Sequence, residues 1–422
     1  MHPCADAEAL VFAQSEPAGT RTAALVRDAA ASAEGAIIEW RRLFHQHPEL
    51  SGRESHTQEM LCGELDRLGV EYRRLDNNGI IATIRGEASG SYDAAGVPAR
   101  RVALRADIDA LPVTEDTGVP FASENEGVMH ACGHDAHMAM MLGAVRILRD
   151  AADSLAGEVR IIFQPAEEIS IGALSMIEAG ALEGVDAIYG AHIWSEVPAG
   201  TVSCAPGQRM ANTDWFRIDI DGVSAHGSMP HKGVDAVVVG AEMVAALQIL
   251  VSRDVSPFEP VVVTVGEFHG GQARNIMAGH AWLTGTVRTW SEGLRSEVPD
   301  RLEHIVSRIA HAFGATARFT FEPGNAGLAN DSTCAEVARQ AVIDTLGDQG
   351  VADYRGTLSG EDFSEYLRIV PGVFCFVGTR NPQVGADHPQ HSCHYTVDED
   401  VLAKGSMVAA QWACRMLSGA KG

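Results

Sequence analysis

Residues 158–192 read EVRIIFQPAEEISIGALSMIEAGALEGVDAIYGAH, and this stretch decides the fold. Within it, Glu158–Gln164 and Val185–His192 are short apolar runs of the kind that form buried strands. Between them, Ile171–Ala179 has the spacing of a helix. A strand, a helix and a second strand in this order predict a mainly parallel sheet covered by helices.

The same alternation continues toward the N-terminus. Ile80–Arg85 and Arg101–Ala106 are apolar runs rich in branched side chains, so each predicts a further buried strand. Helical spacing extends over Thr22–Leu68, with a break near His47, and over His134–Arg149. These elements belong to the same predicted α/β domain.

The pattern changes between residues 210 and 321. The predicted elements there are Trp215–Asp221, Val234–Val251, Val261–Phe268, Ala281–Thr289, Glu297–Phe313 and Ala315–Phe321. Their order is strand, helix, strand, strand, helix, strand, which is that of a ferredoxin-like α+β unit. The α/β pattern resumes at residue 332 and closes with a helix that begins near Asp398 and ends near Leu417.

We therefore predict an α/β fold in which one domain is inserted into another. The catalytic domain comprises residues 1–209 and 322–422, and residues 1–20 form a loosely attached extension. Residues 210–321 form the inserted lid or dimerisation domain, with hinges near Gly207 and Glu322. A chain of 422 residues exceeds the size at which one core stops growing, which also favours two domains.

Charge and composition exclude several classes of partner. The formal net charge of −24 argues against nucleic acid and anionic membranes, because both need basic surfaces. There is no uninterrupted run of 18 apolar residues, so we expect no membrane span. Met1–Thr20 has no basic region typical of a signal peptide. Eight scattered cysteines suggest reduced thiols, so we expect a cytoplasmic protein.

The densest group of reactive side chains is Met129–His137. Cys132 and His134 stand two residues apart just before a predicted helix, so both can reach one metal ion. A lone pair of this kind is more often a buried cysteine beside a solvated histidine. Here His130 and His137 flank the pair, and further candidate ligands follow nearby strands, which favours a metal site.

These further candidates end two neighbouring strands. Glu167 and Glu168 follow the strand 158–164, and His192 ends the next one. In an open α/β sheet, sites form at the carboxyl ends of the strands, where these side chains can converge. Adjacent carboxylates are costly there unless one meets a cation, although a solvated helix N-terminus is the alternative. We expect Glu168 to bind metal and Glu167 to take a proton from metal-bound water.

Two other groups of residues have roles that the sequence alone does not decide. Asp107 and Asp109 end another strand, where each is either a metal ligand, a carboxylate that holds a ligating histidine, or part of a turn. Near the C-terminus, His388, His391 and His394 lie within seven residues. Any one of them could complete a metal site or simply lie on the surface.

Taken in order, these motifs resemble the amidohydrolase branch of the aminoacylase/carboxypeptidase superfamily of two-metal hydrolases. That branch includes hippurate hydrolase, plant hydrolases of indole-acetyl amino acids, and bacterial N-acyl-amino-acid amidohydrolases. The resemblance covers nearly the whole chain after about residue 35. The matching segments are Arg41–Leu50, Ala106–Pro112, Met129–His137, Gln164–Glu168, Gly190–His192, Ala225–His231, Gly285–Thr289, Glu361–Phe363 and His391–Asp400.

The resemblance implies a site with two divalent metal ions, which could be zinc, manganese, cobalt or nickel. The implied ligands are Cys132, His134, Glu168, His192 and His391. Cys132 would bridge the two ions, whereas other branches use a bridging carboxylate. A thiolate ligand favours zinc, but metal availability often decides the ion that is bound.

The resemblance also implies roles outside the metal ligands. Glu167 is the general base, and His226 helps to stabilise the oxyanion. Asn275 and Arg288 hold polar atoms of the substrate, including its carboxylate. Relatives dimerise through the inserted domain, so His226 could serve a neighbouring subunit of a homodimer. The sequence departs from the family pattern at Ala278 and Cys393, where prolines are usual.

The expected reaction is hydrolysis of the amide bond of small N-acyl or N-aroyl amino acids, which releases a carboxylic acid and an amino acid. A dipeptidase or a hydrolase of N-carbamoyl amides would use much the same ligands. A thiol hydrolase with Cys132 as nucleophile belongs to another class. A non-catalytic binding protein is a further alternative, but it would have no use for a free base at Glu167.

Removing metal distinguishes the metal-dependent enzyme from the thiol hydrolase. We expect chelation to abolish amide hydrolysis and single divalent metals to restore it, because the metal activates the attacking water. The measurement is the hydrolysis rate as purified, after chelation, and after addition of zinc, manganese, cobalt or nickel. Undiminished activity after complete chelation would contradict the metal site. Alkylation of Cys132 cannot distinguish the two hypotheses, because both the metal-dependent enzyme and the thiol hydrolase need its thiol.

Overall fold

The computed structural model describes residues 18–418. Most of the predicted N-terminal extension lies outside these residues. The elements of the larger domain before the insertion are α1 (Ala18–Gln46), α2 (Ser55–Leu68), β1 (Glu71–Arg74), β2 (Ile80–Arg85), β3 (Arg101–Asp107), α3 (His134–Asp150), β4 (Glu158–Gln164), α4 (Gly172–Glu178), β5 (Ala187–Pro198), β6 (Val202–Ser203) and β7 (Gly207–Met210). After the insertion come β12 (Leu328–Asn330), α7 (Ser332–Leu346), α8 (Ser364–Leu367), β13 (Gly372–Arg380) and α9 (Leu402–Ser418).

The central sheet has seven strands in the order β1-β2-β4-β3-β5-β13-β6. Its middle strands β4, β3, β5 and β13 run parallel, while β1, β2 and β6 pair antiparallel at the two sides. The predicted α/β fold with a mainly parallel centre is confirmed. Because the four middle strands share a direction, their carboxyl ends meet at one edge of the sheet.

The two faces of this sheet carry separate hydrophobic clusters, because successive side chains of a strand point to opposite faces. On β4, Ile161 and Phe163 join the cluster under α1, α2, α3, α7 and α9. Ile162 between them joins the cluster that includes Ala173 and Met176 of α4 and Tyr366 of α8. The sheet is therefore buried on both faces, as its continuous apolar strands predict.

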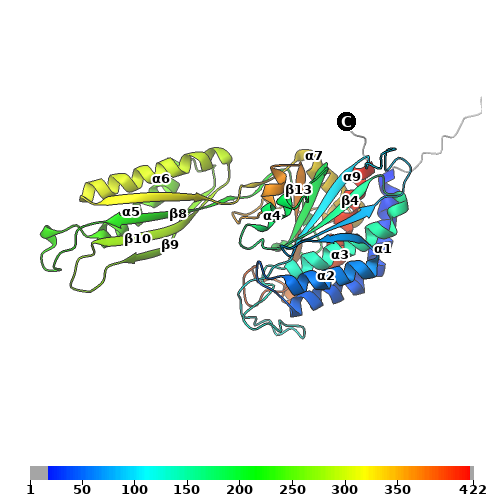
Figure 1. The fold of residues 1–422 in the computed structure, drawn as a ribbon, viewed down its shortest axis with the longest axis horizontal. Helices are drawn as coiled ribbons and strands as arrows, with labels where there is room; N and C mark the ends of the chain where they lie inside the picture. The colour runs from blue at the N-terminus through cyan, green and yellow to red at the C-terminus, as the bar shows by residue number, and fades with distance from the viewer. Residues whose placement is uncertain (1–17, 419–422) are drawn as a thin grey trace, which may run out of the picture.

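The inserted part forms a second sheet of four antiparallel strands in the order β11-β8-β10-β9. Its elements are β8 (Asn212–Asp221), α5 (Ala236–Ile249), β9 (Val261–Gly270), β10 (His280–Thr289), α6 (Glu292–Phe313) and β11 (Thr316–Pro323). This is the predicted strand and helix order, and the part has its own hydrophobic cluster. Figure 1 shows it standing apart from the larger sheet. We propose residues 210–321 as the inserted domain.

One helix bears on the expectation that the chain has no membrane span. Ala236–Asp254, with mean hydropathy 1.6, is long and apolar enough to cross a membrane by length and composition, although only 33% of it is buried in the fold. The sequence criterion missed it because Glu242 and Gln248 interrupt the apolar run. Val239, Met243 and Leu247 of this helix pack into the core of the inserted domain. The segment therefore serves as a core helix that leaves part of its apolar surface exposed.

Candidate metal centre

Cys132 and His134 lie on either side of Gly133, where a buried loop enters α3. Gly133 is the N-cap of this helix and has a φ of 96°, in the left-handed region that favours glycine. A Cβ atom here would lie 2.3 Å from Cδ1 of Ile193 on β5. The missing side chain thus lets the loop with Cys132 and His134 pack directly against β5.

Other candidate ligands come from the carboxyl ends of the neighbouring strands. Glu167 and Glu168 lie in the loop after β4, and His192 lies on β5. Cys132 Sγ is 3.3 Å from His192 Nε2. His134 Nε2 is 3.9 Å from Glu168 Oε1. The parallel strands therefore bring together side chains that are far apart in the sequence.

His391 joins them from the loop before α9. Its backbone N–H donates to Ala131 O over 2.8 Å, which ties this loop to the one that carries Cys132. Its Nε2 is 3.7 Å from Glu168 Oε1, and its side chain is 57% exposed. His388 and His394 instead pack against each other, with ring centroids 5.4 Å apart.

The side-chain atoms that could bind metal, here called donor atoms, form overlapping groups whose members lie within 4.8 Å of one another. One group contains Cys132, His134 and His192. Another contains Cys132, Glu168 and His391. Cys132 belongs to both groups, so its sulfur is placed where a thiolate could face two metal ions.

This set of side chains suits divalent cations. His134 Nε2 and Glu168 Oε1 are buried, and neither has a hydrogen-bond partner within residues 18–418. Burial raises the pKa of the Cys132 thiol well above its usual range, and the nearby Glu168 carboxylate adds to this effect. Burial also raises the pKa of Glu168 to about 7, although His134 opposes it. A bound cation would compensate these negative charges, and thiolate, imidazole and carboxylate are suitable ligands.

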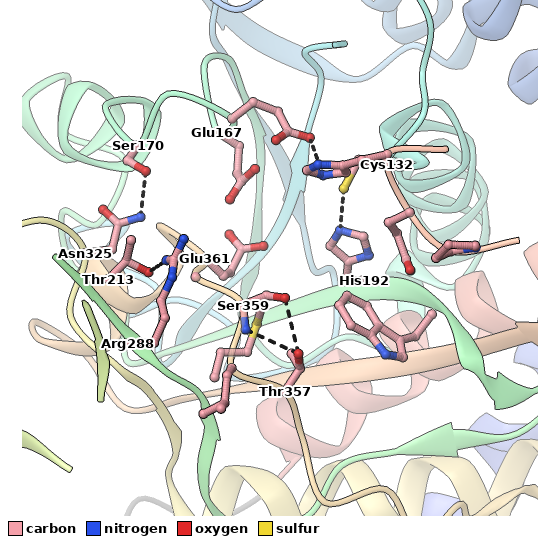
Figure 2. A pocket seen from close by; sticks show the side chains of 18 of the residues that line it. Cys132, Glu167, Ser170, His192, Thr213, Arg288, Asn325, Thr357, Ser359 and Glu361 are labelled. Carbon is pink, nitrogen blue, oxygen red and sulfur yellow. Dashed lines mark hydrogen bonds and ion pairs between the residues drawn. The ribbon is translucent and has the colours of Figure 1, made fainter. Parts of the chain in front are cut away.

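Glu167 lies beside the donors but faces a different neighbour. Figure 2 shows Glu167 and Glu361 pointing toward one another, and their carboxylates form a close group with Asp362. Burial raises the pKa of Glu167 well above its usual range, and the charges of Glu361 and Glu168 raise it further. A carboxyl group with a raised pKa is suited to accept and return a proton.

Two carboxylates orient the histidines by contacting their Nδ1 atoms. Asp109 Oδ1 is 3.2 Å from His134 Nδ1, and Asp107 Oδ1 is 2.5 Å from His137 Nδ1. Arg105 in turn donates to Asp107 Oδ2 over 2.7 Å. Burial lowers the pKa of His134, but Asp107 and Asp109 overcome this effect and raise it to about 10. Both aspartates therefore contact histidines, and Asp107 also belongs to a further group of possible metal ligands with His134 and His137.

A second buried cluster lies next to the start of α3. Asp135 Oδ2 accepts from Arg41 Nε over 2.8 Å and lies 2.8 Å from His45 Nδ1. His130 is buried beside it, and burial lowers the pKa of His130 to about 3. Within the described chain His130 joins none of the donor groups. The two histidines that flank the Cys-Gly-His motif therefore differ: His130 is a neutral core residue, and His137 partners Asp107.

Sequence reasoning missed the side chains that hold the loop after β4. Ala166 has a φ of 56°, which is rare for a residue with a side chain. Its N–H donates to the buried Glu54 carboxylate over 2.9 Å. The N–H of Glu168 donates to Asp109 over 3.0 Å. The sequence could have pointed to Arg105 as a supporting residue, because it is a charged residue within an apolar strand. No local sequence pattern pointed to Glu54.

A cavity of about 710 Å³ opens from the donor groups toward the inserted domain. Arg288 of β10 lines this cavity and donates to Thr213 of β8. Burial lowers the pKa of Arg288, while Asp214 opposes this change. Near it, Asn325 donates to Ser170 Oγ over 2.8 Å, which joins the hinge after β11 to the loop that carries Glu167 (Figure 2).

His226 and Asn275 lie elsewhere in the inserted domain. Asn275 O accepts from the N–H of Gly227, and His226 pairs with Ile276 across a β-bridge. Both side chains are exposed, and neither lines the cavity at the metal-ligand candidates. The structure therefore brings Arg288 to the candidate site but places His226 and Asn275 outside it.

Comparison with known proteins gives consistent matches. Residues 103–415 match the model of peptidase family M20/M25/M40. The chain is 38% identical over 385 residues to an N-acetyl-L-cysteine deacetylase of Bacillus subtilis, with 91% of this chain and 89% of that protein covered. It is also 38% identical over 383 residues to thermostable carboxypeptidase 1 of Saccharolobus solfataricus, with 90% and 95% covered.

A solved structure extends the comparison to the fold. The YXEP protein of Bacillus subtilis, described as a dinuclear metal binding peptidase from the M20 family, superposes with a TM-score of 0.78 at 33% identity. The match covers 92% of this chain and 99% of that one. The chain belongs to peptidase family M20/M25/M40. The predicted family and the predicted enzyme class, a metal-dependent hydrolase of amide carbon–nitrogen bonds, are confirmed.

Gly133→Ala should disturb the candidate metal centre. The new methyl group would meet Ile193, and the positive φ would be strained, so we expect a loss of roughly 1–3 kcal/mol of stability together with weaker metal binding. Gly127→Ala is the matched control, because Gly127 has a φ of 75° but open space around it. Thermal unfolding and metal content per chain are the measurements. Equal metal content in the two variants would contradict the role given to Gly133.

Proposed function

We propose that this protein hydrolyses the amide bond of N-acyl amino acids in a reaction that depends on two divalent metal ions. The observation that carries the proposal is the pair of donor groups that share Cys132, with Glu167 beside them. The N-acetyl-L-cysteine deacetylase similar to this chain supports an N-acyl amino acid as substrate. The cavity that joins these residues to Arg288 supplies room for a small molecule.

The proposed metal ligands are Cys132, His134, Glu168, His192 and His391. Zinc, manganese, cobalt and nickel are all compatible with thiolate, imidazole and carboxylate ligands. When bound, such ions lower the pKa of a coordinated water and polarise a carbonyl oxygen. The free cysteines of the described chain agree with a reducing compartment, so we propose the cytoplasm.

Glu167 is the proposed general base. It would accept a proton from the attacking water and later return that proton to the leaving amine. Burial and the facing Glu361 keep the pKa of the Glu167 carboxyl raised, which makes its carboxylate a stronger base for taking the proton. Arg288 would bind the carboxylate of the amino acid, because its guanidinium lines the cavity and forms no ion pair within residues 18–418.

His226 and Asn275 can act only if they reach the cavity from another position. We propose His226 as the group that stabilises the oxyanion and Asn275 as a further substrate contact. Closure of the inserted domain or a second subunit would bring them there. The second route requires a homodimer formed through the inserted domain.

The surface of α5 supports such a homodimer. Val237, Val238 and Ile249 on this helix are 37%, 47% and 49% exposed. Val238 and Ile249 lie about three turns apart on one side of the helix. Among the described residues, β9 is an edge strand of the neighbouring sheet. An apolar helix face next to a free strand edge is typical of a surface that another subunit covers.

A charge on the α5 face should prevent this association. We expect Val238→Asp to convert a dimer to a monomer, because a carboxylate would be buried without a partner at the interface. Ser307→Asp is the control, since Ser307 lies on the exposed face of α6. The measurement is mass by sedimentation or light scattering. A wild-type monomer at micromolar concentration would contradict the dimer.

The carboxypeptidase similar to this chain favours a second candidate function, the hydrolysis of peptides. A panel of N-acetyl, N-benzoyl and indole-acetyl amino acids, N-carbamoyl amino acids and dipeptides separates the two. We expect the highest kcat/KM for an N-acyl or N-aroyl amino acid. Faster hydrolysis of dipeptides would assign the protein to the peptidases in activity as well as in family.

Glu167→Gln tests the chemistry. The amide keeps the shape of the side chain but cannot take a proton, so we expect turnover to fall by about 10²–10⁴-fold. The metal content should stay at two ions per chain. Glu168→Gln is the matched variant, because it should lose metal as well as activity. Near wild-type turnover in Glu167→Gln would overturn the assignment of the base.

A further inference from the structure

The cavity at the candidate metal centre runs along the second half of β5. His192, Trp194 and Glu196 follow one another along this strand, and the pairing of β5 with β13 becomes irregular between Trp194 and Pro198. All three line the same cavity. The strand therefore arranges an imidazole, an indole and a carboxylate in a row that leads away from the metal-ligand candidates.

The indole of Trp194 is an apolar group held in place between His192 and Glu196. Trp194 is 7% exposed, and its ring packs edge-to-face against His192 at 5.4 Å and against Phe376 at 5.2 Å. Its Nε1–H donates to the hydroxyl of Tyr354 over 2.7 Å. The ring is thus held on several sides, and the small part of it that stays exposed lines the cavity.

Glu196 ends the row with an oriented carboxylate. The hydroxyl of Tyr354 donates to Glu196 Oε2 over 2.7 Å, and Trp194 Nε1 lies 3.4 Å from the same oxygen. Both contacts use one oxygen. No cationic side chain among residues 18–418 forms an ion pair with Glu196, although it is exposed in the cavity mouth. A carboxylate oriented in this way can accept a charge-assisted hydrogen bond from a ligand.

The cavity consequently has opposite charges at two places. Among the described residues, the Arg288 guanidinium on the side of the inserted domain and the Glu196 carboxylate on the side of β5 have hydrogen-bond partners but no ion-pair partner. The metal-ligand candidates Cys132 and His192 line the same cavity. A substrate that satisfies both charges would carry a carboxylate on its amino-acid part and a cation on its acyl part.

We propose that Glu196 is a specificity-determining residue that selects acyl groups ending in an ammonium group. This inference rests on the proposed hydrolysis of N-acyl amino acids. Four residues of strand span at most about 13 Å, so the ammonium group must stand several methylenes away from the amide carbonyl. The methylenes would lie over Trp194, and the ammonium group would bind Glu196. The substrate class is therefore N-(ω-aminoacyl) amino acids and their analogues with basic side chains.

The test compares N-(6-aminohexanoyl)-L-alanine with N-hexanoyl-L-alanine on the metal-loaded wild-type enzyme. We expect kcat/KM to favour the amino compound by about tenfold, the scale of one charge-assisted hydrogen bond. The effect should lie mainly in KM, because Glu196 contacts a part of the substrate remote from the reacting amide. If the cavity offered only apolar contacts and did not bind the ammonium charge, kcat/KM would instead be higher for the hexanoyl compound.

Variants separate recognition of charge from a general loss of structure. Glu196→Gln should lower kcat/KM for the amino compound about tenfold, to the level of N-hexanoyl-L-alanine, so that the preference disappears. Glu303→Gln removes the same charge from the exposed face of α6 and should leave the preference intact. Glu196→Lys should reverse the selection and favour N-(5-carboxypentanoyl)-L-alanine over the amino compound.

The outcomes distinguish this inference from the proposed function. If no member of the amide panel is hydrolysed with metals bound, the proposed function fails. If the panel is hydrolysed but the wild type shows no preference for the amino compound, the inference about Glu196 is overturned. A preference that survives in both Glu196→Gln and Glu196→Lys would overturn it as well.

Discussion

The buried guanidinium of Arg105 holds together the carboxylates on which the candidate site depends. Its nitrogens lie 2.7 Å from Asp107, 3.0 Å from Glu361 and 3.0 Å from Asp362. A buried carboxylate is costly unless a cation or hydrogen bonds compensate it. Without this guanidinium, three buried acidic groups would lose the cation that they share, which would destabilise the arrangement beneath the metal-ligand candidates.

Each of these carboxylates positions a different part of the site. Asp107 lies 2.5 Å from Nδ1 of His137, and the ring of His137 accepts from the backbone of Ile193 beside His192. Asp362 accepts from the N–H of Ala173 at the start of α4. Glu361 faces the proposed base. One buried cation thus connects a histidine, a helix and a proton acceptor that belong to separate segments of the chain.

The sequence predicted the main elements because most of them depend on local patterns. The strand Glu158–Gln164 has the predicted bounds, and the inserted unit has the predicted order. The strand that follows Val185 was predicted too short, because its second half mixes polar and apolar residues without a regular pattern and extends to Pro198. Strand β13 was not delimited at all, although it pairs with β5 in the centre of the sheet. Pairing partners of this kind are decided by long-range contacts, which no local window contains.

Only the family resemblance singled out His391 among three nearby histidines. The other candidate ligands were accessible to sequence reasoning, because thiolate, imidazole and carboxylate groups at the ends of strands or the start of a helix are few and chemically distinctive. Their supporting groups were not. Glu54 holds Ala166 from a distant turn, and Tyr354 orients Glu196 from another. The sequence by itself determined the order of strands and helices and the types of donor available, because both follow from local periodicity and side-chain chemistry. Only the tertiary structure decided which donors meet, which carboxylates stay unpaired and which histidines stay in the core, because burial and distance arise when remote segments pack together.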